Sequence, residues 1–171
     1  MKRKILALTL IFAVVPLLAW GAIRVGFKAN LTGSEVVPPV KTEATGSALL
    51  DLMQKGRSDF EQGGMLLHIS ISVQNLTDAT AAHIHLGIIG KEGPRVVTIF
   101  PFDPSMPGKE GKFSGKLAEG MITEANLEGP LKGKPLGELI KEIQSGNTYI
   151  KVHTKQNPDG ELRGQIVRRP S

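Results

Sequence analysis

The sequence predicts an all-β protein, an antiparallel β-sandwich or barrel with Greek-key-like connections and one short helix. Short segments that alternate apolar and polar residues recur along the chain, and clusters of Gly, Pro and Asn separate them. After the N-terminal segment, apolar residues fall at helical spacing in one place, residues 135–146. A chain of 171 residues is long enough to bury the core of one domain of common size.

The N-terminal segment has the features of an export signal. Three basic residues at 2–4 precede an uncharged, almost wholly apolar run, and Ala-Trp-Gly at 19–21 is the small-x-small triplet after which signal peptidase cuts. We therefore expect residues 1–21 to be a signal peptide and residues 22–171 to form a single domain. Because the uncharged run continues to Ile23, and about 20 apolar residues span a bilayer, an uncleaved N-terminal anchor is the alternative.

Charge and cysteine content limit the classes of protein that fit. The chain has 21 basic and 16 acidic residues, and without the three at 2–4 the balance is 18 to 16. The remaining basic residues are spread out, so the sequence lacks the basic patch that nucleic-acid binding needs. Because the chain has no cysteine, it forms no disulfide and carries no lipid on a cysteine. Asn30 and Asn75 begin glycosylation sequons, which matter only in a eukaryotic secretory pathway.

These features predict an exported protein in the periplasm, on the cell surface or in the medium. Its expected partner is an unidentified protein or envelope component, and it would meet a membrane only through an uncleaved N-terminal segment. Nucleic acid is not an expected partner.

Four strands are expected in the first half of the domain. Residues 23–31 place apolar side chains at alternate positions, and the Pro-Pro pair that follows marks a bend, because proline cannot sit in a central strand. Residues 44–53 form the second strand. Residues 65–73 show the clearest alternation, and residues 79–86 are predicted as a separate fourth strand.

Four more strands and the helix complete the predicted domain. The strands are expected at 95–100, 111–118, 147–153 and 161–168. In 135–146, Pro135 suits the first helical turn and Gly146 suits the position just past the helix end. We expect this helix to pack over an open end of the sandwich with its apolar stripe in the core.

His83 and His85 form the first candidate site. Side chains alternate between the two faces of a strand, so both imidazoles project from the face opposite the core. Imidazoles at this spacing can share a metal ion, with His153 as a third ligand and Glu161 as a fourth. That donor set suits zinc or copper. The alternative is that the two histidines only form hydrogen bonds with neighbouring loops.

The second candidate site is a polar cluster beside the turn at 157–160. Tyr149 and His153 share one face of a strand, and we expect His153 to lie opposite Arg163 or the residue at 165 on the last strand. Arg163 either forms a surface ion pair with Glu161 or binds a loop carbonyl group. Its place in a cluster beside a tight turn argues against a simple surface pair.

The Gly-rich segment at 87–94 does not fit a phosphate-binding loop. It lacks the following helix and the terminal Lys-Ser/Thr pair, so we expect its glycines to supply positive φ angles in a hairpin connection. No Ser-His-Asp arrangement and no pair of acids beside a predicted cleft is present in the sequence. We therefore assign no catalytic residue, and the only expected cofactor is a zinc or copper ion.

Three ordered blocks of sequence carry a family resemblance. They are LTGSEVVPPV at 31–40, AHIHLGIIGKEGPRVV at 82–97 and YIKVHTKQNPDGELRGQI at 149–166. Together they resemble the CHRD domain, which is named for chordin and also occurs in single-domain exported bacterial proteins. The resemblance implies a β-rich, secreted domain for which no general enzymatic activity is established. It emphasises His83, His85, His153, Glu161 and Arg163.

Two functions are compatible with these observations. The favoured one is a non-catalytic binding or structural module of the extracytoplasmic space, because the sequence shows no catalytic set. The alternative is a single-ion zinc or copper protein, redox-active and similar to copper/zinc superoxide dismutase, which is another exported all-β scaffold with a His-x-His strand. The lack of a cysteine pair and the total of four histidines argue against a dinuclear site.

Overall fold

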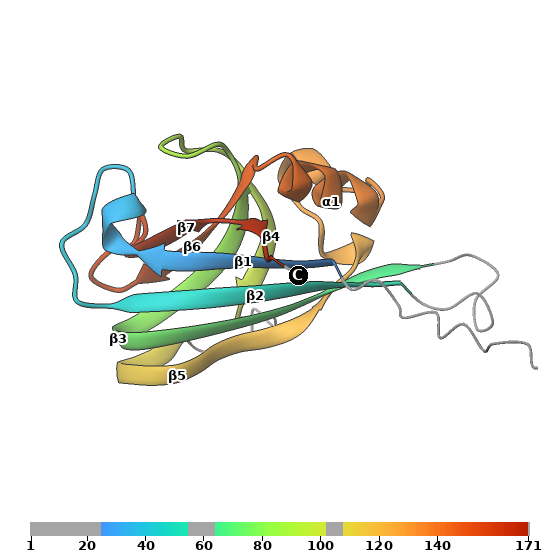
Figure 1. Ribbon diagram of the computed structural model, residues 1–171. Coiled ribbons are helices and arrows are strands. Elements are labelled where there is room, and N and C mark those ends of the chain that lie inside the picture. Colours follow the sequence, from blue (N-terminus) through green and yellow to red (C-terminus); the bar gives the residue numbers. More distant parts are fainter. Residues whose placement is uncertain (1–24, 55–63, 102–107, 171) are drawn as a thin grey trace, which may run out of the picture.

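Eight antiparallel strands form one sheet that closes into a barrel, and a single α-helix lies beside it (Figure 1). The computed structural model describes residues 25–54, 64–101 and 108–170, so the expected signal peptide lies outside the described residues. The all-β prediction with one short helix is confirmed. The strands are β1 (Val25–Thr32), β2 (Thr45–Gln54), β3 (Met65–Leu86), β4 (Arg95–Phe100), β5 (Lys109–Ile122), β6 (Thr148–Thr154), β7 (Leu162–Gln165) and β8 (Val167–Arg168).

Strand β3 is 22 residues long and closes the barrel. Its first part pairs with β2 and β5, and its last part pairs with β6 and β4. The path β2-β1-β7-β6-β3 then returns to β2, so these strands form a ring. A closed ring leaves few unpaired strand edges.

The prediction of two separate strands at 65–73 and 79–86 was wrong, because β3 continues through the polar residues between them. Asn75 and Asp78 adopt left-handed backbone angles, with φ values of 54° and 51°. The register with β5 shifts on both sides of Leu76, as at a β-bulge. The strand therefore bends in the middle instead of ending (Figure 1).

Apolar side chains from every wall fill the barrel interior. Phe27, Leu50, Ile69, Ile84 and Ile150 are all fully buried, and they come from β1, β2, β3 and β6. The alternation of β3 changes phase at its bulge, because odd-numbered residues such as Ile69 are buried before it and even-numbered residues such as Ile84 are buried after it. This leaves His83 and His85 on the outside.

The α-helix α1 (Leu136–Gln144) begins after Pro135 and ends before Gly146, which has a φ of 72°. Its apolar residues are buried in the same core as the strands, as the helical spacing predicts. Single 3-10 turns lie at η1 (Gly33–Glu35), η2 (Glu124–Asn126) and η3 (Gly129–Leu131). In the described part of the chain, no helix has the length and apolar character needed to cross a membrane.

Candidate metal centre and locking cluster

Three histidines meet on the outer wall of the barrel, where β3 and β6 lie side by side. His83 and His85 come from β3, and His153 comes from the neighbouring β6. The ring of His83 lies 5.8 Å from that of His85 and 5.0 Å from that of His153, measured between centroids. Their neighbours on β3, Ala82 and Ile84, are fully buried, so alternation places both β3 imidazoles outside the core as expected.

The spacing of these side chains is close to that of a metal site. One nitrogen from each of His83, His85 and His153 lies within 4.8 Å of the other two. A tetrahedral ion with metal–nitrogen distances of about 2.0–2.1 Å separates its ligand nitrogens by roughly 3.3 Å. Small side-chain movements would therefore bring the three nitrogens to an ion.

Hydrogen bonds to two loops orient the imidazoles of His85 and His153. Nδ1 of His85 lies 2.9 Å from the Gly93 carbonyl oxygen, and Nδ1 of His153 lies 2.8 Å from that of Pro158. Because a carbonyl oxygen only accepts, each Nδ1 carries the proton and each Nε2 keeps its lone pair. Both Nε2 atoms are buried and have no hydrogen-bond partner among the described residues. Metal-binding imidazoles are held by their second nitrogen in the same way.

The surroundings keep all three imidazoles neutral near pH 7. Burial lowers the pKa of His83 to about 3, and the pKa is lowered further by repulsion from His153 and His85 when these are protonated and from the charges of Arg95 and Lys151. Burial also lowers the pKa values of His85 and His153, against the opposing effect of their hydrogen bonds to carbonyl groups. A neutral imidazole is the form that binds a metal ion.

His83 has a different neighbour from the other two histidines. Nη1 of Arg95 lies 3.4 Å from Nε2 of His83, and Arg95 can only donate. The same guanidinium group is held from the other side, because its Nε lies 2.8 Å from a carboxylate oxygen of Glu128. Arg95 is half exposed, and it lies opposite His85 in the register of β3 and β4.

A second group of side chains, which we call the locking cluster, lies beside the histidines on β6 and β7. It consists of Tyr149, Lys151, Arg163 and Gln165. All four are buried although they lie on the outer face of the wall, because the loop at 87–94 folds over them.

Tyr149 connects the histidines to the loop. Its ring stacks on that of His85, with 5.1 Å between centroids and an angle of 13° between planes. Arg163 lies on β7, the neighbour of β6 on the side away from β3. Its guanidinium carbon lies 4.0 Å from the centroid of the Tyr149 ring. The Tyr149 hydroxyl accepts from the Gly93 amide at 3.1 Å and donates to Glu92 at 3.2 Å.

Arg163 binds loop carbonyl groups, which was one of the two predicted alternatives. The side chain is 1% exposed. Its Nη1 donates to the Glu35 carbonyl, and its Nη2 donates to those of Ile88 and Lys91, each at 3.1 Å. Lys151 forms an ion pair with Glu92 of the same loop.

The structure places Glu161 away from the three histidines. One carboxylate oxygen accepts from the Thr42 hydroxyl at 2.7 Å, and the other accepts from Thr154 at 2.6 Å and from the Asn157 amide at 3.0 Å. The described residues show no ion pair between Glu161 and Arg163. Three of the four metal-ligand candidates are therefore brought together, and Glu161 instead fixes the turn at 157–160.

The predicted register of the last hairpin was wrong, because His153 lies opposite neither Arg163 nor Gln165. Lys151, not His153, lies opposite Arg163, and Tyr149 lies opposite Gln165. The predicted strand at 161–168 is also divided, because β7 ends and β8 leaves to pair with β1. The turn expected at Asn157 is present, with a hydrogen bond from the Gly160 amide to the Asn157 carbonyl at 3.0 Å. Asp159 lacks the positive φ that a type II turn requires at this position, which agrees with the expected type I.

Sequence reasoning missed Glu92 and Arg95. Both stand in KEGPR, directly after the His-x-His strand. The hairpin between Leu86 and Arg95 brings these residues back beside the histidines. The short loop between the predicted strands at 79–86 and 95–100 was the sequence feature that could have indicated this. Two of the three glycines of this loop have the expected positive φ angles, 153° at Gly87 and 74° at Gly90, whereas Gly93 does not.

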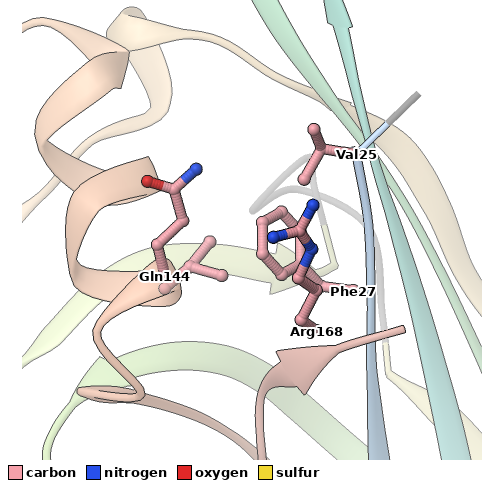
Figure 2. A pocket seen from close by; sticks show the side chains of 5 residues that line it. Val25, Phe27, Gln144 and Arg168 are labelled. Atoms are coloured by element: carbon pink, nitrogen blue, oxygen red, sulfur yellow. The ribbon is translucent and has the colours of Figure 1, made fainter. Parts of the chain in front are cut away.

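One cavity lies apart from the histidines, between α1 and the start of β1 (Figure 2). Its volume is about 370 Å³, and Val25, Phe27, Ile143, Gln144 and Arg168 line it. Gln144 faces Phe27 and Arg168 across the space (Figure 2). None of the buried polar atoms without a partner belongs to a residue that lines this cavity, so nothing there indicates a ligand.

The fold and the site together define a closed antiparallel β-barrel with a three-histidine cluster on its wall. The family model of the CHRD domain matches residues 27–166. The chain therefore belongs to the CHRD domain family, as the three sequence blocks predict.

Curated relatives include two chordins. Chordin of Xenopus laevis is 29% identical over 144 residues, and chordin of Danio rerio is 28% identical over 139 residues. Each match covers 80% of this chain and 12% of the relative, so this chain spans about an eighth of the length of these chordins. No solved structure matches the chain.

Proposed function

We propose that this chain is an exported binding module without catalytic activity, and that its ligand is one zinc or copper ion bound by His83, His85 and His153. The observation that carries this proposal is the pair of buried Nε2 atoms of His85 and His153, which have no partner among the described residues. A buried polar atom without a partner costs free energy, so such atoms call for an explanation. An ion shared with His83 would supply the missing partner for both.

The chemistry of the three donors supports the same ion. Imidazole nitrogen suits zinc and copper, and the lowered pKa values keep the lone pairs free of protons at neutral pH. The Nδ1 hydrogen bonds of His85 and His153 fix both rings before any ion binds. A copper ion would also permit redox chemistry, which zinc does not support.

The proposed location and partner rest on the N-terminal sequence and on the family. The basic and apolar N-terminal segment indicates export, and the CHRD domain also occurs in chordin. We infer that the domain acts outside the cytoplasm and that an extracellular or envelope component is its partner.

Elemental analysis tests the metal proposal. The protein is produced without a polyhistidine tag, loaded with zinc or copper, freed of excess metal and analysed beside His153→Gln. The matched control is His68→Gln, because His68 lies on the outer face of β3 beside Glu119 and outside the cluster. We expect about one ion per chain in the wild type and in His68→Gln.

We expect the His153→Gln protein to lose the ion while circular dichroism shows an unchanged fold. Absence of zinc and copper from the loaded wild type would contradict the proposal. So would retention of a full ion by a folded variant in which His83, His85 and His153 are all replaced by Gln.

A further inference from the structure

We propose that an ion in the three-histidine site keeps one coordination position for a small anion, and that Arg95 is the residue that recognises this anion. This inference rests on the proposed metal site and specifies what else that site binds. It concerns a ligand of the ion and assigns Arg95 no role in holding the metal.

The donor set leaves a position open. His83, His85 and His153 are the three residues that the described chain offers at this point, and a tetrahedral ion takes four ligands. Asp159 also lies near His153, but among the described residues no carboxylate oxygen joins the three histidine nitrogens that lie within 4.8 Å of one another. Glu92 and Glu161 are held by other donors. Glu92 accepts from Lys151 and Tyr149, and Glu161 accepts from Thr42, Thr154 and Asn157.

The charge around the site favours an anion in that position. Neutral imidazoles leave the charge of a divalent ion uncompensated. Arg95 and Lys151 add positive charge, since Arg95 lies 3.4 Å from His83 and Lys151 lies opposite His83 on β6. Lys151 is buried and paired with Glu92, whereas Arg95 is half exposed and can reach a ligand from solvent.

The contact between Arg95 and His83 shows how the guanidinium group would be used. An ion that takes the Nε2 lone pair of His83 removes the acceptor that Nη1 of Arg95 now has at 3.4 Å. Glu128 still holds Nε of Arg95 at 2.8 Å, so the group stays beside the site with donors facing it. A small anion on the ion would accept those donors, and the planar fork of arginine suits such an acceptor.

Azide binding to the cobalt(II)-loaded protein tests this inference. Cobalt(II) replaces zinc as a coloured ion, and cobalt content is measured first for every variant. We expect azide to change the visible spectrum in a saturable, one-to-one manner, and Arg95→Gln to weaken azide binding about tenfold or more. Arg168→Gln, which removes an arginine at the exposed strand β8, should bind azide like the wild type.

Arg95→Gln should bind cobalt at least as tightly as the wild type, because the substitution removes a competitor for the His83 lone pair. Arg95→Lys, which keeps the charge without the fork, should fall between the two in azide affinity. A spectrum that does not respond to azide, an unchanged azide affinity in Arg95→Gln, or loss of cobalt from Arg95→Gln would each overturn the inference.

The outcomes separate this inference from the proposed function. If the wild type binds no cobalt, zinc or copper, both fail. If it binds one ion through the histidines but no azide, only the anion site fails.

Discussion

Lys151 and Arg163 lie opposite each other on β6 and β7, and both are almost completely buried. Two like charges in facing positions of a sheet destabilise it unless each is compensated. Glu92 compensates Lys151, while both terminal nitrogens of Arg163 donate to carbonyl groups and its guanidinium carbon lies over the face of Tyr149; its buried Nε has no partner among the described residues. The loop at 87–94 supplies most of these partners, so burial of the two cations and closure of the loop depend on each other.

Arg163→Met should destabilise the domain by about 3 kcal/mol, because it removes three hydrogen bonds of a charged, buried donor that connect β7 to the loop at 87–94 and to η1. Arg163→Lys should recover less than half of this loss, since lysine keeps the charge but not the fork or the stacking. Urea unfolding measures both, with the exposed Arg168→Met as the control at below about 0.5 kcal/mol. An effect of Arg163→Met as small as that of the control would show that these hydrogen bonds do not hold the loop.

Acid should destabilise the protein through the three histidines. Their folded-state pKa values lie below the ordinary value of 6.5, so between pH 6.5 and the folded value the unfolded chain binds more protons. The free energy of unfolding should therefore be flat above about pH 7 and fall as the pH drops below 6.5. For His83 this window extends down to about pH 3.

The measurement is urea unfolding of the metal-free protein at pH 7 and pH 5, compared with His83→Gln. The wild type should lose more stability between these two pH values than the variant loses. Equal losses would contradict the burial of a neutral His83.

At the scale of elements, the loop at 87–94 packs so closely that one of its glycines has no room for a side chain. A Cβ atom on Gly93 would lie 1.8 Å from the Leu86 carbonyl oxygen, whereas one on Gly90 would meet nothing within 4 Å. Gly90 has a φ of 74°, so alanine there costs only the strain of a left-handed backbone.

Gly93→Ala should destabilise the domain by more than 2 kcal/mol and weaken metal binding, because the loop must move and His85 then loses the carbonyl that orients it. Gly90→Ala should cost about 1 kcal/mol and leave metal affinity unchanged. Urea unfolding and metal titration of the two variants test the difference. Equal metal affinity in both would show that the Gly93 carbonyl does not position His85.

Sequence patterns predicted the positions of most elements, because alternation and helical spacing directly reflect which side chains are buried. They failed at β3, since polar residues around Asn75 look the same at a bulge as at a turn. They also failed for Glu161, whose partners at Thr42 and Thr154 depend on a loop far away in the sequence. The cluster of His83 with His153 was predictable only as a hypothesis, because neighbouring strands cannot be read from one sequence.

At the scale of the whole molecule, one long strand connects the two regions of the barrel. The first half of β3 builds the wall with β2 and β5, and the second half carries His83 and His85 beside β6. The site therefore sits on the closed ring of strands and not on a loop, which favours rigid placement of the ligands. The bulge at Asn75 is where the strand changes partners.

Cleavage of the expected signal peptide, residues 1–21, is tested on the full-length chain. Expression with the native N-terminal segment in a secreting host should give a mature protein that begins at Ala22, because signal peptidase would cut after Gly21. Intact-protein mass spectrometry of the exported fraction checks this. A membrane-bound protein that keeps residues 1–21 would instead establish the N-terminal anchor.

The central claim is that one ion is bound by three imidazoles on the barrel wall. X-ray absorption spectroscopy of the zinc- or copper-loaded protein tests it most directly, because the fine structure reports the kind, number and distance of the ligands. We predict three imidazole nitrogens at about 2.0–2.1 Å, with one further light-atom ligand. A shell of oxygen ligands without the multiple-scattering signal of imidazole would contradict the claim.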